Sequence, residues 1–99
     1  MDILALHEKM TKHLFPAFSS SDERFLALAL CGETGELANM VKKRWRDNAD
    51  LYEECCNELV DIRVYTELLI HCFNMTEAQF NHRVEAKLAD VARRHGIKE

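Results

Sequence analysis

Two stretches of the chain decide the fold: residues 22–44, DERFLALALCGETGELANMVKKR, and residues 51–72, LYEECCNELVDIRVYTELLIHC. Both carry apolar side chains at alternating steps of three and four residues, the spacing of one face of an α-helix. The apolar rows are Leu26, Leu30, Leu37 and Met40 in the first stretch, and Leu51, Cys55, Ile62, Tyr65 and Leu69 in the second. The pattern therefore predicts two long amphipathic helices.

A glutamate interrupts each apolar row, at Glu33 and at Glu58, and a second acid follows three residues later, at Glu36 and Asp61. Residues three apart on a helix share one surface. Burying unpaired carboxylates is costly, so acids in these places need a positive partner. Clustered carboxylate oxygens suit a hard divalent cation such as Mg²⁺ or Mn²⁺. The alternative is a set of salt-bridged or solvated acids.

The polar connector between the two stretches, residues 46–50, is short. Helices joined in this way pack as antiparallel neighbours. Because Glu33 and Glu58 stand at similar distances from the connector, both acid pairs are expected at one height on facing helices.

The composition supports an all-α fold for residues 1–99 as a single domain, since 47% of the residues are hydrophobic and the chain has one proline and three glycines. Four helices are expected: from Asp2 to about Leu14, from Ser20 or Ser21 to about residues 44–46, from a cap at Asp50 to about Phe73, and from Thr76 to about Arg94. So short a chain has a modest core. A four-helix-type bundle completed by oligomerisation, as a homodimer or homotetramer, is predicted.

The remaining whole-chain features narrow the class of protein. A net charge of −4 gives no reason to expect a nucleic-acid partner. Neither a signal peptide nor a membrane helix is recognisable, so a cytoplasmic protein is expected. Four cysteines without metal-binding spacing are expected to be reduced and buried: Cys31, Cys55, Cys56 and Cys72.

The acid motifs resemble a known family. Gly32-Glu33-Thr34-Gly35-Glu36-Leu37-Ala38, followed by Glu58-Leu59-Val60-Asp61, is similar to the E-x-x-E…E-x-x-D signature of the MazG-like nucleotide pyrophosphohydrolases, which include dimeric dUTPases and dCTP pyrophosphatases. The likeness extends over about residues 22–94. It implies Mg²⁺-dependent hydrolysis of a nucleoside triphosphate to the monophosphate and pyrophosphate. Glu33, Glu36, Glu58 and Asp61 would hold the metal and serve catalysis, with Mn²⁺ as a possible substitute.

The resemblance also implies a set of substrate contacts. Lys87 interrupts the apolar row Phe80, Val84, Val91 and matches a phosphate-contacting lysine of the relatives. The polar residue that usually follows one turn later is here Val91, so Arg94 or Lys43 is expected to take its place. His7 and Trp45 are the candidates for contacting the base. For each of these five, a structural role (a salt bridge, a helix-end charge, a packing or surface position) is the competing interpretation.

Two other functions fit a helical scaffold with acids. A carboxylate-bridged di-iron or di-manganese bundle characteristically uses E-x-x-H, and here the residues three after Glu33 and Glu58 are acids instead. A non-catalytic regulatory helical dimer would keep the scaffold without turnover, and metal-dependent turnover distinguishes it from an enzyme.

Overall fold

The computed structural model describes residues 5–6, 9, 12–13 and 22–98. Within these residues lie three helices and no strand: α2 (Glu23–Asp47), α3 (Tyr52–Cys72) and α4 (Glu77–Arg94). The predicted all-α class is confirmed. The helix expected over residues 2–14 falls largely outside the described residues, although those described within it are helical.

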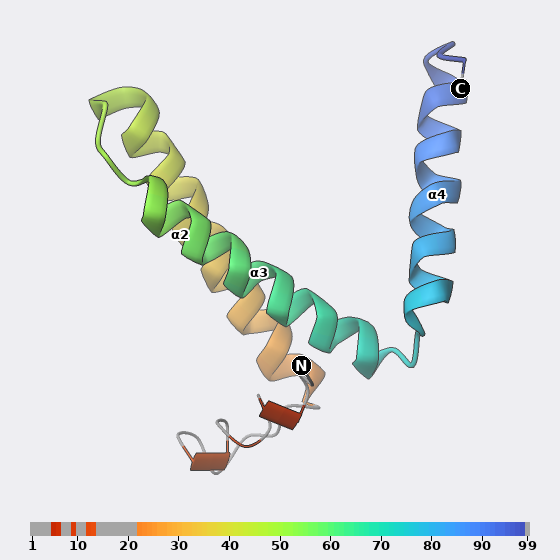
Figure 1. Ribbon diagram of the computed structural model, residues 1–99, viewed down its shortest axis with the longest axis horizontal. Helices are drawn as coiled ribbons and strands as arrows, with labels where there is room; N and C mark the ends of the chain where they lie inside the picture. Colours follow the sequence, from red (N-terminus) through yellow and green to blue (C-terminus); the bar gives the residue numbers. More distant parts are fainter. Residues whose placement is uncertain (1–4, 7–8, 10–11, 14–21, 99) are drawn as a thin grey trace.

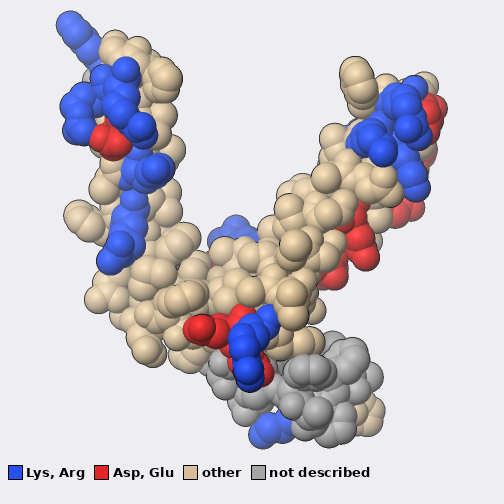
Figure 2. Space-filling model, turned by 180° about the vertical axis from the view of Figure 1, so that it is seen from behind, with Lys and Arg blue, Asp and Glu red and all other residues tan. Residues whose placement is uncertain are grey.

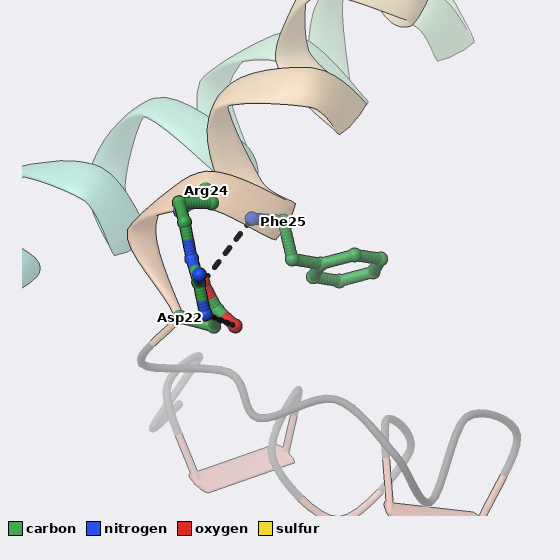
Figure 3. Close-up of polar contacts among 3 residues, drawn as sticks. All are labelled: Asp22, Arg24 and Phe25. Atoms are coloured by element: carbon green, nitrogen blue, oxygen red, sulfur yellow. Dashed lines mark hydrogen bonds and ion pairs between the residues drawn. The ribbon is translucent and has the colours of Figure 1, made fainter.

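α2 begins at a carboxylate cap (Figure 3). Asp22 Oδ1 accepts hydrogen bonds from the backbone N–H groups of Arg24 at 3.0 Å and Phe25 at 3.4 Å. The Arg24 guanidinium also bonds Asp22, and these contacts hold the pKa of the Asp22 carboxyl below its usual range. The cap is therefore Asp22, and not the predicted Ser20 or Ser21, because an ionised carboxylate suits the positive end of the helix better than a hydroxyl.

The connection from α2 to α3 is tight. Asn48 adopts a left-handed conformation (φ 54°), which asparagine tolerates, and ends α2. The predicted cap at Asp50 is wrong: Leu51 occupies the cap position of α3 without a side-chain hydrogen bond, and its N–H bonds the Ala49 carbonyl. The Arg44 guanidinium lies over the Tyr52 ring, 6.0 Å from its centroid, and ties the two helix ends together.

Hydrogen bonds hold the backbone of the α3–α4 connection both at the end of α3 and at the start of α4. The N–H of Asn74 (φ 58°) bonds His71 O at 2.9 Å and the N–H of Met75 bonds Ile70 O at 3.2 Å, which is a Schellman motif. The predicted Thr76–Gln79 capping box then starts α4 and is confirmed. The chain direction at this corner is thus fixed by main-chain and cap contacts.

α2 and α3 lie antiparallel and side by side, as predicted, whereas α4 projects away from them (Figure 1). The buried hydrophobic side chains of the described residues all belong to the α2–α3 hairpin: Leu26, Cys55 and Leu68. Of the four cysteines expected to be buried, only Cys55 is buried: Cys31 is exposed, and Cys56 and Cys72 are half-buried, so the expectation is wrong for these three. In the described residues, no helix combines the length and the apolar character needed to cross a membrane.

Candidate metal centre

Three carboxylates converge between α2 and α3. One oxygen each of Glu33, Glu36 and Glu58 lies within 4.8 Å of the others. Glu33 and Glu36 come from the same face of α2, three residues apart, and Glu58 comes from the facing side of α3. The antiparallel pairing of the two helices therefore brings the two sequence motifs together.

The cluster reaches from the helix interface to the surface. Glu33 and Glu58 are half-buried and Glu36 is exposed. The Oε2 atom of Glu58 is buried and has no hydrogen-bond partner. Ionised carboxylates only accept hydrogen bonds, so the neighbouring glutamates cannot satisfy this oxygen unless a proton or a cation enters.

The pKa values of the clustered glutamates also indicate negative charge that is not neutralised. The closeness of Glu33, together with partial desolvation, raises the pKa of Glu58, although Glu36 acts in the opposite direction. The pKa of Glu36 is raised chiefly by its contact with Glu58 and by the charge of Glu58. The negative charge of Asp61 adds to both effects. Like charges at this range disfavour full ionisation, so Glu36 and Glu58 of the metal-free cluster lose their protons at a higher pH than isolated glutamates do.

No basic side chain neutralises these acids within the described part of the chain. The residues one turn before and after each acid are apolar, small, amide, phenolic or acidic. None of the ion pairs between described residues involves Glu33, Glu36, Glu58 or Asp61. A set of oxygen donors with one unsatisfied buried atom, and with no cation among the described side chains to neutralise it, fits a small divalent ion.

Asp61 stands at the edge of the cluster, exposed, and is not one of its three converging residues. Its charge nevertheless acts on Glu36, Glu58 and Tyr65. Tyr65 belongs to the apolar row of α3, but its pKa is raised first by burial and then by the charges of Glu33 and Asp61. Its phenol therefore borders the site. Because residues four apart share one surface of a helix, the spacing from Asp61 to Tyr65 could have predicted this position from the sequence.

The basic residues expected to contact phosphate are not gathered around the cluster in a single chain. Lys87 and Arg94 lie on α4, which projects away from the hairpin (Figure 1). Arg94 Nε pairs with Asp90 at 3.1 Å. Lys43 is exposed on α2, where its charge lowers the pKa of Asp47, after the larger effect of Arg46.

The aromatic candidate also lies apart from the acids. Trp45 is 86% exposed at the end of α2, about 13 Å along the helix axis from Glu36. It borders a shallow hollow of about 290 Å³ with Val41, Arg44, Asn48 and Ala49. His7 lies outside the described residues.

Comparison of the chain with protein-family models, with curated proteins and with solved structures gave no match. The likeness to the MazG-like enzymes therefore rests on the two acid motifs and on what surrounds them.

Proposed function

We propose that this protein is a Mg²⁺-dependent hydrolase that converts a nucleoside triphosphate to the nucleoside monophosphate and pyrophosphate. One observation carries the proposal: Glu33, Glu36 and Glu58 converge within 4.8 Å, with a buried Glu58 oxygen that no described group satisfies. The resemblance of the motifs supplies the reaction class.

Mg²⁺, or Mn²⁺ in its place, would neutralise phosphate oxygens and polarise the phosphoryl group that is attacked. The carboxylates of Glu33, Glu36 and Glu58 would hold it, with Asp61 adding negative charge at the edge of the site. Water would form the new bond to the α-phosphorus as the bond to the bridging oxygen of pyrophosphate breaks. A carboxylate of the cluster would accept the proton of that water.

The remaining expectations belong to the same proposal. Lys87, Arg94 and Lys43 would contact phosphate oxygens, and Trp45 and His7 the base. The substrate would be a ribo- or deoxyribonucleotide, and the working form a homodimer or homotetramer in the cytoplasm, without a nucleic-acid or membrane partner. The physiological task would be the removal of unwanted nucleotides or control of the deoxynucleotide pool.

The test is pyrophosphate release from a panel of all ribo- and deoxyribonucleoside triphosphates, with Mg²⁺ and with EDTA, resolving the products by chromatography. Wild type should give monophosphate and pyrophosphate with Mg²⁺ alone. Glu58→Gln and Glu36→Gln should lose at least a hundredfold in rate while keeping their helical circular dichroism. Glu85→Gln, at an exposed glutamate on α4, is the matched control and should keep full activity.

Two outcomes would contradict the proposal. Turnover by Glu58→Gln equal to wild type would remove the cluster from the reaction. Absence of turnover on every nucleotide by a well-folded protein would favour the regulatory helical dimer instead.

A further inference from the structure

The end of the α2–α3 hairpin exposes several aromatic and apolar side chains. Trp45, the only tryptophan of the chain, is 86% exposed, Tyr52 is 59% exposed and Val41 is 47% exposed. Tryptophan side chains are on average far more deeply buried than this. Exposed apolar side chains that lie together mark surfaces that bind a ligand or a partner.

These side chains surround a single hollow. Val41 and Trp45 are four residues apart on α2 and therefore share one surface of the helix. Together with Arg44, Asn48 and Ala49 they line a hollow of about 290 Å³, which is close to the lower limit for small-molecule pockets. The lining thus combines an indole, a guanidinium and an asparagine that can both donate and accept hydrogen bonds.

The positive charge at this end of the hairpin is only partly neutralised. Figure 2, where this end stands at the upper right, shows the basic side chains gathered there: Lys42, Lys43, Arg44 and Arg46. Arg46 Nε pairs with Asp47 Oδ1 at 2.8 Å. No ion pair joins Lys42 or Arg44 to another described residue. The acids of the connector and of the first turn of α3 do not line the hollow: Asp50, Glu53 and Glu54.

An aromatic ring supports the guanidinium that lines the hollow. The Arg44 guanidinium lies over the Tyr52 ring, 6.0 Å from its centroid. A cation–π contact of this kind uses the face of the guanidinium, whereas its N–H groups point outward in the plane and remain able to bond an anion. Arg44 is therefore placed to bind a phosphate group beside the Trp45 indole.

This hollow is separate from the carboxylate cluster of the same chain. Trp45 follows Glu36 by nine residues, which is two and a half turns of an α-helix, so the two side chains leave α2 on opposite sides. They are also about 13 Å apart along the helix axis. A nucleotide whose phosphates lie at Glu36 therefore cannot place its base on Trp45 of the same chain.

We propose that the hollow at the end of the hairpin is a second nucleotide-binding site, in which the base stacks on Trp45 and Arg44 binds the phosphate. A nucleotide combines a flat heterocycle with an anionic phosphate, and these groups match an exposed indole and a guanidinium without an ion pair. Stacking on an indole accepts any base. The site needs no metal, because its anion contact is a protein cation, and it does not depend on the proposed reaction.

The fluorescence of Trp45 tests the inference, because the chain has no other tryptophan. Each ribonucleoside monophosphate is titrated in EDTA, with excitation where the bases do not absorb. The quenching should saturate with a Kd below about 1 mM. Arg44→Gln should weaken binding at least tenfold, whereas Arg83→Gln, at an exposed arginine on α4, is the matched control and should bind as wild type does. Glu58→Gln, which alters the carboxylate cluster, should also leave the Kd unchanged.

Further probes separate the contribution of the ring from that of the charge. Uncharged nucleosides and inorganic phosphate should each bind at least tenfold more weakly than the monophosphates. Trp45→Ala, measured by equilibrium dialysis because it lacks the fluorescent reporter, should also lose at least tenfold in affinity. Circular dichroism should show the same helical content for every variant, since the exchanged side chains are exposed or half-buried.

Three results would overturn the inference. The first is the absence of saturable quenching by any monophosphate, and the second is equal binding by Arg44→Gln and wild type. The third is quenching that requires Mg²⁺ and disappears in Glu58→Gln, which would assign Trp45 to a nucleotide bound at a carboxylate cluster. Binding is measured without turnover, so a failure of the hydrolase proposal leaves this test unaffected.

Discussion

Glu58 is proposed to bind the metal as a carboxylate, but its negative charge destabilises the metal-free fold. Its pKa is raised by the neighbouring Glu33 and by desolvation, so the folded chain binds a proton there more tightly than the unfolded chain does. A raised carboxyl pKa adds stability below the ordinary value of about 4.3, and this contribution is lost as pH rises through the folded-state pKa. Without metal, the cluster therefore weakens the fold at neutral pH.

Replacing Glu58 by glutamine removes this conflict. In EDTA at pH 7, Glu58→Gln should melt at a higher temperature than wild type. The difference should shrink as pH falls, because wild-type Glu58, whose pKa is raised, regains its proton above the ordinary value of about 4.3. Thermal melts followed by circular dichroism at several pH values measure this, with Glu85→Gln expected to behave as wild type. A lower melting temperature for Glu58→Gln would show that the charge already has a protein partner.

At the scale of helices, α2 has an unusual feature beside the acids. Gly35 lies in the interior of the helix, where glycine is unfavourable, and a Cβ added there would have no atom within 4 Å in a single chain. Gly35→Ala should therefore raise the free energy of unfolding by about 0.5–1 kcal/mol, measured by urea titration at fixed protein concentration. A loss of stability instead would mean that another surface approaches this side of α2.

The helices themselves were largely predictable from the sequence, for local reasons. The three-and-four spacing gave the two long helices, and the Thr76–Gln79 pair gave the start of α4. The starts of α2 and α3 were misplaced because several residues there can cap a helix, and the choice depends on backbone geometry. Asp22, and not a serine, caps α2. Asp50 does not cap α3, because Leu51 takes the cap position and its N–H bonds the Ala49 carbonyl.

For the whole molecule, the sequence predicted how α2 and α3 pack against each other, but it did not predict the direction of α4. The short connector predicted that α2 and α3 are antiparallel, and hence that Glu33, Glu36 and Glu58 would meet. The direction of α4 depends on the left-handed Asn74, which no spacing reveals. For this reason the relation of Lys87 to the acids could not be predicted.

The central claim is that the carboxylate cluster binds a divalent cation, and isothermal titration with Mg²⁺ and Mn²⁺ tests it most directly. Wild type should bind at pH 7.5. Binding should weaken as pH falls, because the raised pKa values of Glu36 and Glu58 let protons compete with the metal at a higher pH than they would at ordinary carboxyl groups. Glu58→Gln should lose this binding and Glu85→Gln should keep it. Identical isotherms for wild type and Glu58→Gln, or no binding by wild type at millimolar Mg²⁺, would contradict the claim.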